Sequence, residues 1–127
     1  MKKIVSTTNA PGAIGPYSQA IVAGNTVYVS GQLGLIPETG EFAGDTVEAQ
    51  AIQVFKNIQG ILEAAGSDMD HIVKTTCFIK NMEDFGTVNQ VYAQFLSEGS
   101  YPARSAVEVS ALPKGGLVEI ETIAIIK

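Results

Sequence analysis

Two stretches of this chain read as β-strands, Pro102-Ala103-Arg104-Ser105-Ala106-Val107-Glu108-Val109 and Leu117-Val118-Glu119-Ile120-Glu121-Thr122-Ile123-Ala124-Ile125-Ile126. Successive side chains of a strand point to opposite faces of its sheet, and both faces of the second stretch are largely apolar. One layer of helices covers only one face of a sheet. We therefore expect a further copy of this chain to cover the other face.

Upstream of these strands, the clearest helical pattern spans residues 46–65. Its apolar side chains recur at helical spacing, at Val47, Ala51, Val54, Phe55, Ile58, Ile61, Leu62 and Ala65. Asp45 stands three residues before Glu48, which resembles a capping box, and Gly66 follows as a stop signal. The pattern predicts a long amphipathic helix with a defined beginning and end.

A second helix and four further strands complete the expected order. Residues 82–97 also repeat apolar side chains at helical spacing, and Asn81 is the predicted cap. Gly24-Asn25 is a strong turn signal and predicts a hairpin. The other strands are expected at residues 2–6, 17–23, 26–32 and 71–80, with Pro- and Gly-rich loops at residues 9–16 and 37–40. The order β-β-β-α-β-α-β-β predicts one α+β domain over residues 1–127, with both helices on one face of the sheet.

Composition excludes several classes of protein. The chain has 127 residues, 46% of them hydrophobic, and a net charge of −5 with its eight basic residues scattered, which disfavours nucleic acid as a partner. No apolar run approaches the ~18 residues of a membrane span. One cysteine and one histidine provide neither an intrachain disulfide nor a zinc site with the usual ligands. The first residues lack the apolar region of a signal peptide, so we expect a cytoplasmic location.

Arg104 and Glu119 are the main candidates for chemistry. A guanidinium is always charged, and its planar fork of donors matches a carboxylate. Ala106 lies on the same face as Arg104 and leaves space beside it. A carboxylate in an apolar strand is costly unless it has a partner or a task. Together they indicate a site where a small anion undergoes proton chemistry, although Arg104 also fits a surface ion pair and Glu119 an edge charge that opposes aggregation.

Other polar residues are weaker candidates. Tyr17 ends a Gly/Pro loop and could reach over a site, and Ser30-Gly31 would let a ligand approach the backbone. Asn89 lies on the second helix, where a solvated role is nearly as plausible. His71 is expected to be exposed, and Cys77 to be a buried strand residue rather than a nucleophile.

Four motifs in this order resemble the RidA family, the YjgF-type reactive intermediate deaminases. They are Ile14-Gly15-Pro16-Tyr17-Ser18-Gln19-Ala20, Val29-Ser30-Gly31-Gln32, Pro102-Ala103-Arg104-Ser105 with Val107-Glu108-Val109, and Leu112-Pro113-Lys114 with Val118-Glu119-Ile120-Glu121. The resemblance runs from about Ala10 to Ile125. It implies a homotrimer of chorismate-mutase-like subunits, each with a mixed six-stranded sheet, and sites in the clefts between subunits.

The resemblance also implies a reaction. PLP-dependent dehydratases release 2-aminoacrylate or 2-aminocrotonate, which tautomerise to 2-iminopropanoate or 2-iminobutanoate and hydrolyse to 2-keto acids and ammonia. The imine carbon is already electrophilic, so neither a metal nor a cofactor is expected. Arg104 would hold the carboxylate and Glu119, favoured over Glu121, would position a water. Tyr17 would close the pocket, with Ser30, Gly31 and Asn89 as further substrate-binding residues.

One position departs from the family pattern, and three other functions stay open. The family often has a cysteine two residues after the arginine, where this chain has Ala106; hydrolysis by water does not require that thiol. A non-enzymatic trimer that senses small carboxylates or keto acids would use the same Arg104. RNA cleavage is disfavoured by the acidic composition, and chorismate mutase chemistry would rest on shared fold alone.

Overall fold

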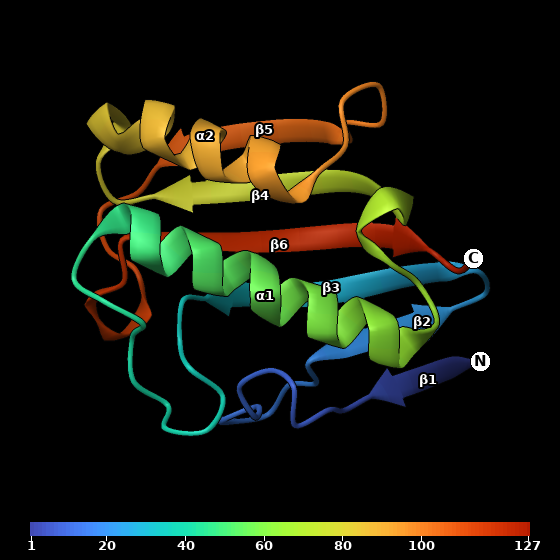
Figure 1. Cartoon of the computed structure of the whole chain (residues 1–127). Helices are drawn as coiled ribbons and strands as arrows, with labels where there is room; N and C mark the ends of the chain where they lie inside the picture. The colour runs from blue at the N-terminus through green and yellow to red at the C-terminus, as the bar shows by residue number, and fades with distance from the viewer.

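Six strands and two helices follow the predicted order in the computed structural model, which describes residues 1–127. Their bounds are β1 Lys2–Val5, β2 Ala20–Ala23, β3 Thr26–Leu33, α1 Val47–Ala65, β4 Ile72–Ile79, α2 Phe85–Phe95, β5 Ala103–Glu108 and β6 Val118–Ile125. The strands form one sheet in the order β1-β2-β3-β6-β4-β5. Only the β4–β5 pair is parallel, so the sheet is mixed. Both helices lie in front of it in Figure 1, and the predicted α+β arrangement is confirmed.

Helix α1 begins one residue later than its predicted cap implies. Thr46, rather than Asp45, is the cap, because its Oγ1 accepts a hydrogen bond from the Ala49 N–H at 3.2 Å. Gly66 ends the helix as predicted, with a positive φ of 89° that a residue with a side chain rarely adopts. Neither α1 nor α2 is long and apolar enough to cross a membrane.

The predicted start of the second helix is wrong. Residues Met82–Asp84 form a short 3₁₀ turn, and α2 begins at Phe85. The Asn81 side chain makes no capping hydrogen bond. Its place is taken by Glu108 of β5, whose Oε1 accepts the Met82 N–H at 2.8 Å. Because the acceptor comes from a distant strand, no local sequence signal marks it.

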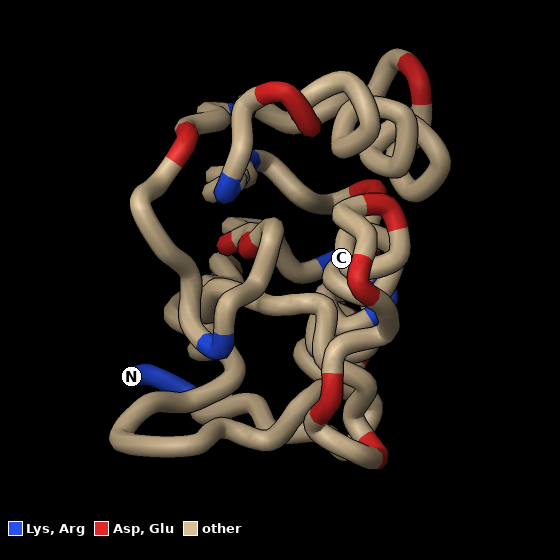
Figure 2. The backbone as a smooth tube through the Cα atoms, turned by 90° about the vertical axis from the view of Figure 1, so that its left-hand side faces the viewer, with Lys and Arg blue, Asp and Glu red and all other residues tan.

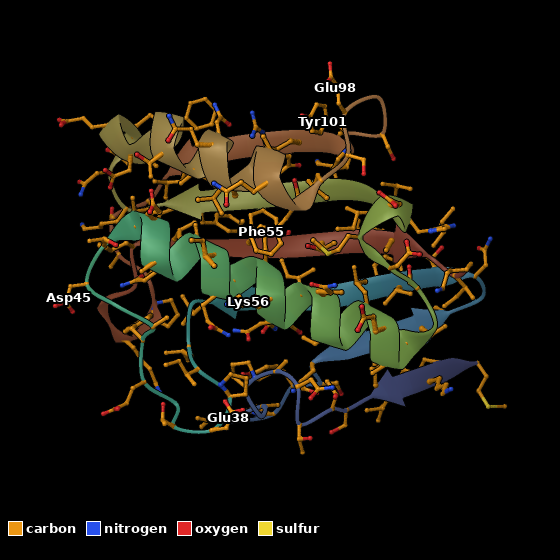
Figure 3. All side chains as sticks on the ribbon, viewed as in Figure 1. Glu38, Asp45, Phe55, Lys56, Glu98 and Tyr101 are labelled. Carbon is orange, nitrogen blue, oxygen red and sulfur yellow. The ribbon has the colours of Figure 1, made fainter.

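The two faces of β6 have opposite surroundings. Val118, Ile120 and Ala124 are fully buried on the face that carries the helices. On that side Phe55 of α1 stacks on Phe95 at 5.3 Å between ring centroids, and Figure 3 shows it between α1 and the sheet. The helix-free face stays partly open and carries exposed apolar side chains from four strands, Ile4, Tyr28, Val107 and Ile125. The prediction of two apolar faces is confirmed.

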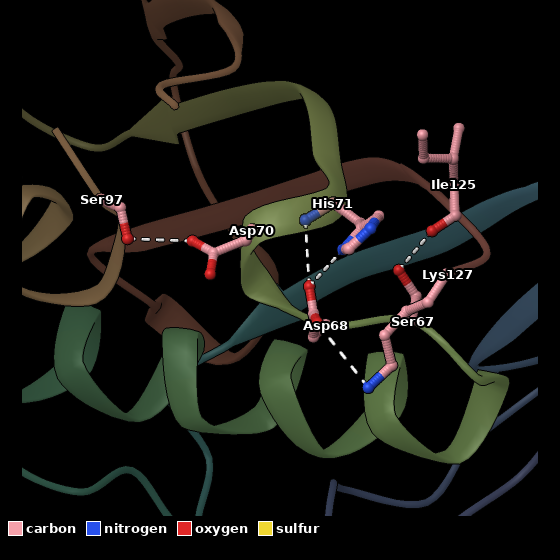
Figure 4. Close-up of polar contacts among 7 residues, drawn as sticks. All are labelled: Ser67, Asp68, Asp70, His71, Ser97, Ile125 and Lys127. Atoms are coloured by element: carbon pink, nitrogen blue, oxygen red, sulfur yellow. Dashed lines mark hydrogen bonds and ion pairs between the residues drawn. The ribbon is translucent and has the colours of Figure 1, made fainter. Parts of the chain in front are cut away.

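The only histidine lies in the connection from α1 to β4 (Figure 4). His71 Nδ1 is 2.6 Å from Asp68 Oδ1, and the same oxygen accepts the His71 backbone N–H at 3.1 Å. Lys127 Nζ lies 3.7 Å from the other carboxylate oxygen. The hydrogen bond from His71 lowers the pKa of Asp68 below its usual value. Ser67 Oγ of the same connection donates a hydrogen bond to the carbonyl of Ile125 at 2.6 Å, at the end of β6. His71 therefore has a structural role within this connection.

Candidate active site

The predicted site residues divide between two cavities. Tyr17, Ser30, Gly31 and Glu119 line the larger one, of about 650 Å³, together with Glu121. The smaller cavity, of about 360 Å³, is lined by Asn89, Tyr92, Ala93, Tyr101, Pro102 and Arg104. Tyr101 lies in the loop between α2 and β5, at the upper edge of Figure 3. The predicted proton-transfer residue, Glu119, and the predicted carboxylate-binding residue, Arg104, therefore line different cavities.

Glu119 lies on the helix-free face of β6, between the buried Val118 and Ile120. Its carboxylate packs on the backbone of Gly31, where the register between β3 and β6 shifts. A Cβ added at Gly31 would lie 2.8 Å from Glu119 Oε2, so only glycine leaves the carboxylate in this place. Burial, and secondly the charge of Glu121, raise the pKa of Glu119 above its usual value.

The other polar groups of the larger cavity hold its walls. Tyr17 is exposed, and its hydroxyl accepts a hydrogen bond from the Ile14 N–H at 3.3 Å. Ser30 Oγ donates to the carbonyl of Ser18 at 2.7 Å. Both side chains therefore fix the loop that precedes β2. The only carboxylates that line this cavity are those of Glu119 and Glu121.

Arg104 is the second residue of β5, and its side chain turns toward α2. Its Nη1 donates a hydrogen bond to Asn89 Oδ1 at 2.6 Å. Its Cζ lies 5.1 Å from the ring centre of Phe85 and 4.8 Å from that of Tyr92, within cation–π range. No carboxylate is paired with it, since the two salt bridges of the chain involve other residues. The guanidinium is thus oriented by neutral groups and is free to bind an anion.

Arg104 and Glu119 lie on opposite faces of the sheet. Arg104 pairs with Thr75 of β4, whose buried side chain contacts Tyr92 under α2. Glu119 pairs with Phe78, three residues further along β4 and hence on its other side. One chain alone therefore does not bring the cation and the carboxylate into a single cavity.

Sequence reasoning missed Phe85 and Tyr92. Together with Asn89 they stand at i, i+4 and i+7 of one helix, which is the spacing of a single helix face.

Sequence reasoning also missed three buried amides that hold the loops around the larger cavity. Gln19 binds the carbonyl of Pro11, Asn57 those of Leu33 and Leu35, and Gln50 the N–H of Leu117. Polar residues inside the apolar helix pattern were the available signal for two of them.

The remaining reactive side chains lie apart from these cavities. Burial raises the pKa of the Cys77 thiol to about 11, so the thiolate that attacks electrophiles is scarce at neutral pH. His71 lines neither cavity. No group of three His, Cys, Asp or Glu side chains is placed to hold a metal ion. The Lys and Arg positions are dispersed along the backbone in Figure 2.

Comparison with known proteins assigns the family. The family model described as Endoribonuclease L-PSP matches residues 7–126. The chain belongs to this family. The resemblance to RidA proteins is also confirmed, because relatives named 2-iminobutanoate/2-iminopropanoate deaminase and Reactive Intermediate Deaminase A align along 97–98% of the chain. One of them, the 2-iminobutanoate/2-iminopropanoate deaminase of Mus musculus, is 50% identical over 98% of this chain and 92% of its own length.

Solved structures of similar sequence share this fold. RidA from an Antarctic Psychrobacter is 52% identical and has a TM-score of 0.94, covering 98% of this chain and 99% of the other. TdcF from E. coli, crystallised with bound serine, is 44% identical with a TM-score of 0.92, covering 98% of this chain and 99% of the other. The six-stranded mixed sheet with two helices is therefore the fold of the family.

Proposed function

We propose that the chain is an imine deaminase, which hydrolyses 2-iminobutanoate and 2-iminopropanoate to 2-keto acids and ammonia. The observation that carries the proposal is the guanidinium of Arg104, which is oriented by Asn89 and two rings but has no carboxylate partner. Relatives about 50% identical along the whole chain carry the name of this activity. A cytoplasmic location is part of the proposal, since the only cysteine is a free, buried thiol.

The residues divide the work of hydrolysis. Arg104 binds the substrate carboxylate through two parallel N–H···O bonds. Glu119 accepts a proton from a water molecule while the water oxygen attacks the imine carbon. The C=N double bond becomes a C–N single bond. Glu119 passes this proton to the nitrogen and then relays the proton of the new hydroxyl to the same nitrogen. The C–N bond breaks, ammonia leaves, and the C=O of the keto acid forms. Proton transfer by a positioned group contributes about 10²–10⁴-fold. Tyr17 closes the cavity over the bound substrate.

The site is completed by a second copy of the chain. Because Arg104 and Glu119 lie on opposite faces of one sheet, a neighbouring subunit must supply one of them. The helix-free face offers the apolar surface for such contacts, including Tyr28 and Ile125. A closed trimer would pair each Arg104 cavity with the Glu119 cavity of a neighbour.

The proposal is tested by adding the purified protein to a serine or threonine dehydratase reaction. We expect faster appearance of pyruvate or 2-ketobutyrate, with the rate of amino-acid loss unchanged, because the protein acts after the dehydratase releases its product. Unchanged keto-acid appearance, together with tight pyruvate binding, would contradict the proposal and favour a carboxylate sensor. Light scattering in the same buffer should show a trimer.

A further inference from the structure

We propose that Tyr92, held in place by Thr75, is the positioning residue that fixes the plane of the Arg104 guanidinium. The inference rests on the proposed function, because it concerns how the carboxylate-binding group of that site is held. Arg104 itself is largely exposed at the start of an edge strand, where a long side chain has many rotamers open to it. A bidentate grip needs one of those rotamers to be favoured before the substrate arrives.

The ring of Tyr92 cannot change its orientation cheaply. Tyr92 is buried, and its hydroxyl forms a 2.8 Å hydrogen bond with Oγ1 of Thr75, which is fully buried in β4. A change of χ1 would carry the ring away from Thr75 and leave both hydroxyls without a partner inside the protein. The plane of the Tyr92 ring is also fixed, because Phe55 packs against it edge to face, with 5.5 Å between the ring centroids.

Arg104 lies against this fixed ring. Its Cζ is 4.8 Å from the Tyr92 centroid, closer than the 5.1 Å to Phe85. Thr75 is also the β4 residue that pairs with Arg104 in the sheet. The hydroxyl that anchors the ring and the backbone that carries the arginine therefore belong to one rigid unit. The hydrogen bond from Nη1 to Asn89 Oδ1 also restricts rotation of the guanidinium within its own plane.

The sheet gives this arrangement a specific consequence for the reaction. Within the chain, Tyr92 contacts Arg104, the carboxylate-binding group, whereas Glu119 lies on the opposite face of the sheet. Loss of the Tyr92 ring should weaken carboxylate binding and raise KM, while kcat at saturating substrate stays nearly constant. A residue that serves only the core would lower thermal stability and leave the affinity of the folded protein unchanged.

The test compares Tyr92→Leu, Tyr92→Phe and the matched control Phe95→Leu. Phe95 lies on the same helix and stacks on Phe55, but it makes no cation–π contact with Arg104. Pyruvate binding is measured by calorimetry on folded protein, and KM and kcat by keto-acid release. We expect Tyr92→Leu to weaken pyruvate binding about 3- to 30-fold, the range for a lost cation–π contact, with kcat within about twofold. Tyr92→Phe, which keeps the ring, should weaken it less.

The outcomes separate this inference from the proposed function. Phe95→Leu should lower the melting temperature and leave the dissociation constant for pyruvate unchanged. If Tyr92→Leu binds pyruvate as tightly as the wild type, the positioning role is overturned and the deaminase proposal stands. If the wild type neither binds pyruvate nor accelerates keto-acid release, the proposed function fails and takes this inference with it. Equal loss of affinity in Tyr92→Leu and Phe95→Leu would also overturn the role, because packing alone would then explain both.

Discussion

Replacement of Gly31 by alanine should abolish most of the turnover without unfolding the protein. The new methyl carbon would lie 2.8, 3.0 and 3.2 Å from Oε2, Cδ and Cγ of Glu119, all in one flexible side chain. The carboxylate, rather than the backbone, should therefore move, by about 0.5–1 Å. A misplacement of this size near reacting atoms costs up to about 10²-fold. We expect keto-acid release to fall about 10- to 100-fold, while pyruvate binding through Arg104 is retained.

The assay needs controls that separate position from stability. Gly86→Ala in α2 is matched, because nothing lies within 4 Å of the added carbon; its turnover should be unchanged and its unfolding free energy about 0.4–1 kcal/mol higher. Gly34→Ala is the opposite case. Its methyl would meet the Gln50 backbone, with Cα at 2.7 Å, and should destabilise by about 1–3 kcal/mol. Full turnover in a folded Gly31→Ala variant would refute the role given to the Glu119 carboxylate.

Three further predictions follow from single contacts. Arg104→Lys keeps the charge but not the planar fork, so calorimetry should show pyruvate affinity reduced by about 2 kcal/mol, roughly 30-fold; wild-type affinity would contradict a bidentate grip. Glu121→Gln removes a charge that raises the pKa of Glu119, so the acidic limb of the kcat/KM profile should move to lower pH. An unmoved limb would mean that another group titrates there. Thr122→Val removes a buried hydroxyl with no hydrogen-bond partner and should leave unfolding free energy unchanged or raise it by up to about 1 kcal/mol; a loss above about 1 kcal/mol would show that the hydroxyl is satisfied.

Local patterns predicted the fold well because each helix and strand is determined largely by residues close to one another in the sequence. The helical repeat gave α1, and the αL position of Gly66 ended it as expected. Prediction failed where a partner is distant in sequence. The 3₁₀ turn that precedes α2 is capped by Glu108 of β5, which lies 26 residues along the chain from Met82, whose N–H it accepts.

The sequence proposed the candidate site residues but did not predict how they are arranged. Alternation along each strand assigns Arg104 and Glu119 to one of two faces, yet it does not say which face of β5 continues which face of β6. That relation depends on the pairing of both strands with β4, and pairing between distant strands has no signal within either one. The rings around Arg104 were missed because aromatic residues at helical spacing are usually core residues.

Subunit complementation tests the claim that Arg104 of one copy and Glu119 of another form one imine-hydrolysing site. Arg104→Ala and Glu119→Gln chains, each nearly inactive alone, are unfolded together and refolded as mixed oligomers. Random mixing should then restore about a quarter of the wild-type keto-acid release, since that share of interfaces regains both intact side chains. If both residues acted within one chain, no mixed oligomer would hold an intact site. Activity that stays at the level of the separate variants would contradict the account.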